Sequence, residues 1–205
     1  SQRDHNPGRY SICTAFSMEG WDERQWEEQV LSWLMEGFEK GAVAVKVWKN
    51  IGMVFQDAAG EMVMIDDPKF DPIFEFIRKR NMTLMGHLGE PRDCWMPLDS
   101  MKANNNRNYF REHPEYHMYL HHELPSYQDQ IDARDRKLAK HPDLRFIAVH
   151  LGSLEWDVEQ IALRLDRFPN MAVDMAARIG HLFHQTVNDR EKVRQFFIKY
   201  QDRIL

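Results

Sequence analysis

Two histidines, His87 and His150, occupy matching places in two similar segments, MTLMGHLGEP (82–91) and LRFIAVHLGS (144–153). In each segment a short apolar run carries its only imidazole near its end and is followed by Leu-Gly. A neutral imidazole is the commonest metal ligand among side chains and also exchanges protons near neutral pH. Since parallel strands deliver functional side chains at their C-terminal ends, the repeated pattern predicts a metal or proton-transfer site there.

Two other ionisable residues, Lys46 and Asp174, stand near the ends of two further strand-like runs. Side chains alternate between the faces of a strand, so we expect all four residues on the face opposite the main aliphatic side chains. In the His150 strand this alternation places Phe146 and Ala148 on the same face as the imidazole. A lone histidine at a strand end more often has a hydrogen-bonded structural role, but four matched residues favour a functional site.

Strand-like and helix-like segments alternate along the chain, and this order predicts a parallel sheet with helices outside it. The predicted strands are 9–16, 42–48, 82–88, 144–151, 170–177 and the start of another at 202–205. The predicted helices are 22–41, 71–80, 126–140, 153–165 and 188–200. No internal linker divides residues 1–205, so we expect one domain.

Three of these helices begin at residues with capping chemistry. Ser126 with Asp129 has the pattern of a capping box. Asp71 followed by Pro72 fits an N-cap and a first helical position. Ser153 is placed to cap the helix that follows the second histidine.

The predicted loops differ in length at the two ends of the strands. Turns from helix to strand are short, whereas a hairpin after Trp48 and an irregular segment at 89–126 both follow strand C-termini. The hairpin is expected to turn at residues 57–60, and residues 104–108 are expected to form turns. Long loops at strand C-termini build the active-site face of a (β/α) barrel, so loop length and the histidines indicate the same end.

Composition excludes several classes of function. The 205 residues are 43% hydrophobic and 29% charged, with a net charge of −5, and they contain no basic stripe and no apolar stretch of membrane-spanning length. We therefore expect a small-molecule substrate, no nucleic acid and no membrane as partners, and leave open a homo-oligomer. Cys13 and Cys94 lack metal-type spacing and fit a reducing, cytoplasmic compartment. The opening residues SQRDHNPGRY show neither an initiator Met nor a signal sequence, so export stays open.

The runs GAVAVKVWKNIG, NMTLMGHLGEP, LRFIAVHLGS and NMAVDMAARI together resemble the amidohydrolase superfamily. The similarity extends from about Ala15 to Leu205. It is greatest to the amidohydrolase-related group, which also holds the aminocarboxymuconate-semialdehyde decarboxylase-like enzymes. The resemblance implies a (β/α)8 TIM barrel with a divalent metal at its C-terminal face, and zinc is the ion we expect.

The resemblance also assigns roles by position. His87 matches the terminal histidine of the fifth barrel strand, which is a metal ligand. His150 matches the sixth-strand histidine, a second ligand in two-metal members and a contact to substrate or metal-activated water in one-metal members. Lys46 matches a fourth-strand lysine that some branches carboxylate to bridge two metals and that this group more often keeps as a plain amine.

Two parts of the family pattern have no counterpart in this sequence. The first strand of the family carries an HxH pair of ligands, and here no two histidines are two residues apart. The eighth strand ends in an aspartate, and the sequence stops at Ile204-Leu205, where that strand should begin. A full barrel takes about 250 residues. We therefore expect an incomplete barrel, about strands three to seven plus the start of eight, whose metal shell needs further ligands.

Other side chains are candidate substrate contacts. Arg178, just past the last full strand, could clamp a carboxylate through its planar guanidinium or pair with Asp174, itself a candidate contact. Glu90 follows the first histidine and could orient it or contact substrate. His117 and His121 are four residues apart but lack the glutamate of a zinc-protease motif, so we assign them to a lid.

We interpret the chain as most of a metal-dependent hydrolase that uses a metal-activated water on a small amide, lactone or ester. His87 would hold the metal, His150 would bind it or stabilise the attacked oxygen, and Lys46 and Arg178 would be cationic substrate contacts. Two alternatives stay open. One is a metal-dependent decarboxylase, a lyase, on the same scaffold, since the fold does not separate the two activities. The other is a non-catalytic α/β binding module.

Overall fold

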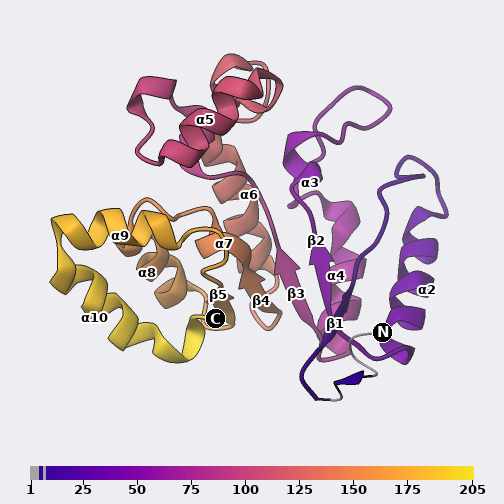
Figure 1. Ribbon diagram of the computed structural model, residues 1–205. Coiled ribbons are helices and arrows are strands. Elements are labelled where there is room, and N and C mark those ends of the chain that lie inside the picture. Colours follow the sequence, from indigo (N-terminus) through magenta and orange to yellow (C-terminus); the bar gives the residue numbers. More distant parts are fainter. Residues whose placement is uncertain (1–4, 7) are drawn as a thin grey trace.

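The chain forms an open parallel sheet in the part that the computed structural model describes, residues 5–6 and 8–205 (Figure 1). Its strands are β1 (Ile12–Thr14), β2 (Ala42–Val47), β3 (Thr83–Gly86), β4 (Arg145–Ala148) and β5 (Met171–Val173). They lie side by side in chain order, each parallel to the next. A parallel bridge between Val173 and Ile204 continues this order, as expected for a strand starting at 202–205. All five strands are shorter than predicted.

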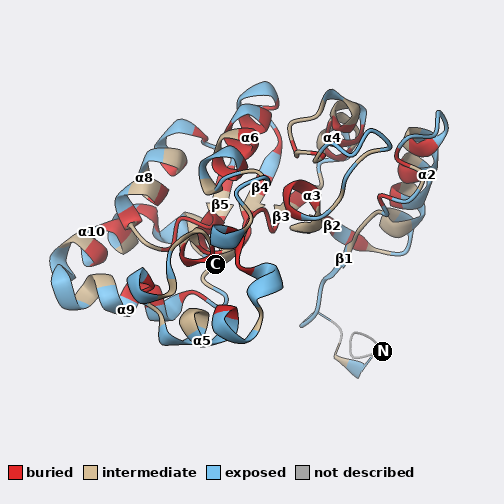
Figure 2. Cartoon of the chain, turned by 90° about the horizontal axis from the view of Figure 1, so that it is seen from above, coloured by how far each residue is buried: buried red, intermediate tan, exposed pale blue. Residues whose placement is uncertain are grey.

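Helices connect the strands, and part of them cover one side of the sheet. They are α2 (Trp26–Glu39), α3 (Asn50–Met53), α4 (Asp71–Lys79), α5 (Asn104–Glu112), α6 (Tyr127–Lys140), α7 (Val149–Gly152), α8 (Val158–Arg167), α9 (Ile179–Asn188) and α10 (Arg190–Tyr200). Short 3-10 segments lie at Pro68–Phe70, Arg92–Trp95, Leu98–Ser100, Pro114–Tyr116, Met118–Leu120 and Gln201–Arg203. Seen from above, α2, α4, α6, α8 and α10 form an outer arc around the strands (Figure 2). Within the described residues, no helix has the length and apolarity needed to cross a membrane.

The apolar face of α2 shows why this segment is helical. Trp26, Val30 and Leu34 stand four residues apart, are all buried, and share the face turned to β1 and β2. The ring of Trp26 meets Trp21 edge-on at 4.7 Å and Phe70 at 5.9 Å between centroids. This aromatic contact joins α2 to the segment before α4.

The hairpin predicted after β2 is largely absent from the structure. The helical turn α3 replaces most of its first strand, and the pairing is reduced to an antiparallel bridge between Gln56 and Met62. Beside this bridge the Val63 N–H donates to the Phe55 carbonyl at 3.1 Å and the Asp57 N–H to the Glu61 carbonyl at 3.0 Å. The predicted turn is present, because the Gly60 N–H donates to the Asp57 carbonyl at 3.0 Å.

The segment between β3 and α6 is more regular than its composition indicated. Residues 104–108, predicted to form turns, are instead the first part of α5. The segment folds around a small core of its own, formed with α3 by Met53, Cys94, Met101, Phe110 and Met118. This core explains how a polar stretch keeps a fixed position above the sheet.

Of the three predicted helix caps, the structure confirms one. At α6 the Ser126 hydroxyl accepts the Asp129 N–H, and the Asp129 carboxylate accepts the Ser126 N–H at 2.8 Å, which confirms the capping box. Asp71 is the first residue of α4 and not its cap. Ser153 does not cap α8, because Asp157 accepts the Glu159 N–H there.

Strand register separates two faces of the sheet. One row, buried against the helices, consists of Val45, Leu84, Phe146 and Met171. The next row, on the more open face, consists of Lys46, Met85, Ile147 and Ala172. Lys46 thus takes the predicted face, but the prediction for β4 is wrong, because Phe146 and Ala148 face the helices. A side chain at Gly86 would meet the Phe146 ring at 2.5 Å, so β3 needs glycine there.

The Asp71 carboxylate provides a test of the packing between α4 and α6. It accepts hydrogen bonds from Lys137, Lys140 and His141. Burial alone would raise the pKa of Asp71, yet these three bonds outweigh it and hold the pKa well below its usual range. We expect Asp71→Asn to lower the free energy of unfolding by about 2 kcal/mol at pH 7. The deficit should shrink as the pH falls below about 4, where the unfolded carboxyl takes up its proton. Urea unfolding at a series of pH values measures both.

Glu75→Gln is the matched control. Glu75 lies on the same helix and pairs with Arg78, but at the solvent-exposed surface, where ion pairs contribute little. A loss in Asp71→Asn no larger than in this control, or one independent of pH, would contradict the account of Asp71.

Candidate functional site

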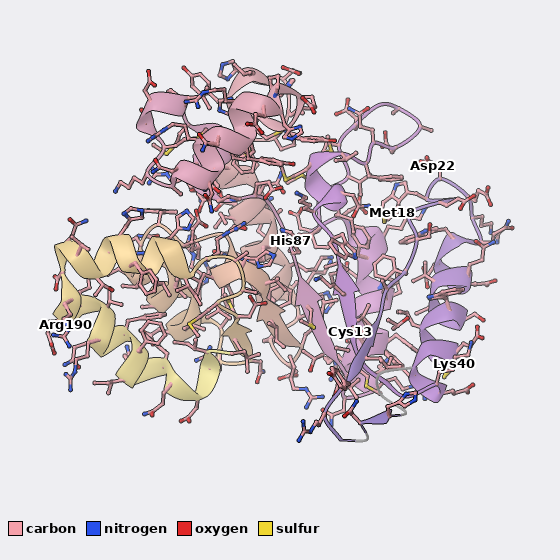
Figure 3. All side chains as sticks on the ribbon, viewed as in Figure 1. Cys13, Met18, Asp22, Lys40, His87 and Arg190 are labelled. Atoms are coloured by element: carbon pink, nitrogen blue, oxygen red, sulfur yellow. The ribbon has the colours of Figure 1, made fainter. Side chains whose placement is uncertain are left out.

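His87 and His150 lie against each other at the C-terminal ends of β3 and β4. Their ring centroids are 4.5 Å apart and the rings are perpendicular, with an interplanar angle of 88°. His87 directly follows β3, and its backbone N–H donates to the Val47 carbonyl at 3.1 Å, which ties it to β2. Figure 3 shows His87 at the end of the sheet from which the α5 segment rises.

A left-handed turn after β4 places His150 beside His87. The alternation of side chains along a strand does not place it there. Four consecutive residues have positive φ: His150 (59°), Leu151 (58°), Gly152 (62°) and Ser153 (56°). The predicted strand 144–151 therefore ends at Ala148, and α7 is mostly this turn. Left-handed backbone costs roughly 1–2 kcal/mol for each residue with a Cβ. Strain of this kind is concentrated at functional sites.

The environment of His87 keeps its imidazole neutral. The residue is 8% exposed, and its Nε2 atom is buried without a hydrogen-bond partner. Burial lowers the pKa of His87 to about 3, helped by His150 and by the nearby cations Lys49, Arg178 and Lys46. An unprotonated imidazole with a free ring nitrogen is what a metal ion requires of this ligand.

Hydrogen bonding fixes the orientation and the tautomer of His150. Its Nδ1 lies 2.8 Å from the Ala176 carbonyl oxygen, which can only accept, so Nδ1 carries the ring proton. Burial lowers the pKa of His150 as well. The ring is therefore neutral at pH 7, with the Nε2 lone pair free to bind a metal or accept a proton.

Asp174 lies behind His150 and supports it. Its Oδ1 accepts the backbone N–H groups of His150 and Ala176, both at 2.9 Å, and lies 3.8 Å from His150 Nδ1. Its backbone carbonyl accepts the Leu151 N–H at 2.7 Å. The sequence predicted Asp174 as a substrate contact, and these bonds give it a further part in shaping the left-handed turn.

Three cations surround the histidine pair. The Lys46 ammonium stands 4.4 Å from the ring centroid of Trp48, and that ring is 6.1 Å from His87. Glu90 forms an ion pair with Lys49 and lies 3.9 Å from the Arg178 guanidinium. Arg178 thus pairs with Glu90, whereas the sequence offered Asp174 as its partner. Arg178 Nε is buried without a hydrogen-bond partner, so this guanidinium keeps a free donor.

Two residues of this region escaped the sequence analysis. Lys49 belongs to the same VKVWK run as Lys46 and stands just past the strand end, which was a usable signal. Glu155 is 1% exposed, and its Oε1 accepts the Arg92 N–H at 2.9 Å, while Oε2 has no partner. Burial raises the pKa of Glu155 to about 7. Nothing in the spacing of SLEWD marked Glu155 as buried.

His117 and His121 contact backbone carbonyls in the loops above the sheet. His117 Nε2 lies 2.8 Å from the Met96 carbonyl, and His121 Nε2 lies 3.3 Å from the Pro114 carbonyl. Both contacts stay within the segment between β3 and α6. The pair forms no zinc site with other described side chains, and its assignment to a lid stays a prediction.

The fit of a metal ion can be judged from the donors present. Over residues 5–6 and 8–205, no three His, Cys, Asp or Glu side chains are grouped to hold a metal on their own. The histidine pair, neutral and with unpartnered Nε2 on His87, fits two positions of a divalent metal site. A catalytic zinc needs three protein ligands, so the described residues offer part of such a site.

Comparison with known proteins identifies the family. The amidohydrolase family model matches residues 20–205, so the chain belongs to the amidohydrolase family, whose members are enzymes. This confirms the resemblance seen in the four strand-end motifs. No curated protein matches the chain in sequence.

Solved structures show the same fold. A 2,6-dihydroxybenzoate decarboxylase in complex with 2,6-dihydroxybenzoate is 18% identical with a TM-score of 0.56, over 100% of this chain and 61% of that one. A 2,6-dihydroxybenzoate decarboxylase from Rhizobium is 19% identical with a TM-score of 0.56, over the same shares. An uncharacterised TIM-barrel protein from Bordetella bronchiseptica is 17% identical with a TM-score of 0.49, over 85% of this chain and 46% of that one. The two decarboxylase structures share the fold of the chain, which forms part of a (β/α) barrel. The chain spans 46 to 61% of the length of the three structures.

The neutral state of His87 is open to direct measurement. Nitrogen-15 NMR of histidine-labelled, metal-free protein should show no titration of His87 between pH 8 and about 5, because its pKa is lowered to about 3. The same chain unfolded in urea should titrate near 6.5, so stability should fall as the pH drops below that value. A folded-state midpoint near that of the urea-unfolded chain would contradict the buried, neutral site.

Proposed function

We propose that the protein is a metal-dependent hydrolase that attacks a small amide, lactone or ester with a water molecule. The observation that carries this proposal is the pair of neutral imidazoles at adjacent strand ends, with His87 Nε2 buried and unpartnered. A buried polar atom without a partner is costly, and a bound ion would remove that cost. Family membership supports an enzyme, and the active-site end of the barrel fold supports this location.

His87 would hold the metal through Nε2, and His150 would either share it or face the substrate. A divalent ion, for which zinc is our choice, would lower the pKa of a water molecule and polarise the substrate carbonyl. Two histidines leave such a site short of donors, so the proposal requires further ligands. The solved structures with this fold are longer than the chain, which supports ligands from a longer polypeptide.

The tautomer of His150 favours hydrolysis. With its proton on Nδ1 and that proton donated to Ala176, His150 presents a lone pair at Nε2. Such a nitrogen can accept a proton from water or bind a metal. In this state the ring is a base, so a decarboxylase on this scaffold would take the proton for its carbon atom from another group.

The cations around the site support decarboxylation as a second candidate. Lys46, Lys49 and Arg178 all act on His87. Glu90 pairs with Lys49 and lies 3.9 Å from Arg178, and the carboxylates of Glu155, Asp174 and Asp93 also act on Arg178. Arg178 has the free donor that a carboxylate would take. A hydrolase of an acidic ester or lactone would use the same contacts, so charge alone does not decide the reaction. Under either activity a carboxylate on the small-molecule substrate would meet the free donor of Arg178.

The proposal predicts that metal depends on His87. We expect the full polypeptide containing this chain to bind about one zinc per chain and His87→Ala to lose it, measured by plasma emission spectrometry after dialysis. His121→Ala, a histidine of the lid segment, is the control and should keep its metal. Stoichiometric metal in His87→Ala with unchanged thermal stability would sink the assignment. Absence of metal from the unsubstituted protein, with no effect of added zinc, would favour the binding-module alternative.

A further inference from the structure

One face of α6 holds two strand-end loops, one of which carries His150. Tyr127, Gln130 and Arg134 stand three and four residues apart, so they share that face. Tyr127 Oη donates to the Ser153 carbonyl and Gln130 Nε2 to the Gly52 carbonyl, both at 2.5 Å. Arg134 Nη1 donates to the Gly152 carbonyl. All three bonds end on backbone carbonyls of loops that follow β2 or β4.

The left-handed turn 150–153 depends on such outside partners. The carbonyls of His150 and Leu151 accept the N–H groups of Ser153 and Leu154 at 3.2 and 3.1 Å. The carbonyls of Gly152 and Ser153 instead meet donors from α6. A Cβ added to Gly152 would stand 2.9 Å from Arg134 Nη1 and 3.0 Å from the Ala148 Cβ. The guanidinium is therefore packed directly on the turn, and only glycine leaves room for it.

Arg134 is itself held rigidly. It is 2% exposed, and its Nε and Nη2 donate to Asp135 Oδ1 at 3.2 and 3.0 Å. Asp135 Oδ2 accepts Arg164 Nε at 3.1 Å, which ties the pair to α8. A buried guanidinium with its charge balanced and its orientation fixed is suited to positioning and has no path to solvent or substrate.

The same turn connects to the loop of His87. The Ser153 hydroxyl donates to the Leu88 carbonyl at 3.0 Å, one residue beyond that histidine. Arg134 thus contacts the turn 150–153 on one side. The other side of this turn contacts the loop that follows β3. This chain of contacts links the turn that carries His150 to the loop that carries His87.

We propose that Arg134 is a positioning residue for His150, acting through the left-handed turn 150–153 and touching neither metal nor substrate. Tyr127 assists Arg134 by donating to the carbonyl of Ser153, the next residue of the turn. The consequence for metal affinity rests on the proposed function, whereas the consequence for the orientation of His150 does not.

The experiment compares Arg134→Met, which keeps the apolar stem but removes the donors, with Arg134→Lys, which retains one charged donor. Arg136→Met is the control, because Arg136 lies on the same helix and pairs with Asp66 at the surface. The first readout is the nitrogen-15 spectrum of His150 in the metal-free full polypeptide. Unsubstituted protein and Arg136→Met should show the single Nδ1–H tautomer, Arg134→Met a mixture of tautomers, and Arg134→Lys an intermediate spectrum.

The second readout is zinc affinity by competition with a chromophoric chelator. Loss of a residue that orients a ligand typically weakens metal binding about 10- to 100-fold, and we expect this in Arg134→Met with partial recovery in Arg134→Lys. If Arg134→Met fails to fold, Tyr127→Phe replaces it. This milder change removes one hydroxyl, and the His150 tautomer and zinc affinity are compared in the same way.

An unchanged His150 tautomer in folded Arg134→Met and Tyr127→Phe would overturn the proposal. So would a change of the same size in Arg136→Met, because the effect would then follow from charge on α6 and not from the turn. If the unsubstituted protein binds no zinc, the proposed function fails, and the tautomer comparison still decides the role of Arg134.

Discussion

Parallel pairing of β2, β3, β4 and β5 determines which side chains end next to one another. Lys46 pairs with Met85, Met85 with Ile147, and Ile147 with Ala172, so the strands finish at a common edge. Every loop that follows this edge inherits a fixed starting point, and the parallel order requires the helices between the strands to return on the outside. The packing of α2 to α10, the position of the α5 segment and the meeting of the two histidines all depend on this register.

The sequence predicts most of this frame and part of the site. Alternating apolar runs located the strands, and the repeated HLG motif located His87 and His150 at neighbouring strand ends. The left-handed turn was not predictable, because four consecutive residues adopt positive φ and two of them, Leu151 and Ser153, are not residues that favour it. Strand alternation consequently gave Phe146 the wrong face. The regular structure of the α5 segment was not predicted for another reason. Its apolar residues are sparse and meet only in the folded chain, so they form no helical or strand periodicity in the sequence.

The site brings together groups whose burial or clustered charge would each be energetically unfavourable alone. Two imidazoles are taken out of water and kept neutral, three cations stand close to them, and Glu90 is the carboxylate paired with Lys49 and Arg178. Unpartnered nitrogen atoms remain on His87 and Arg178. An ion at the histidines and an anionic group at the cations would satisfy both sets of atoms. The strained turn 150–153 fits the same account. It places the His150 ring beside His87, whereas a regular strand would turn that ring towards the helices.

The central claim is that the His87–His150 pair is the protein's part of a metal centre. Anomalous diffraction at the zinc absorption edge, from crystals of the full polypeptide grown with zinc, tests it most directly. The account predicts a single strong peak about 2.1 Å from His87 Nε2, on the side that faces His150. A zinc peak elsewhere, with His87 Nε2 still buried and unliganded at saturating zinc, would contradict it.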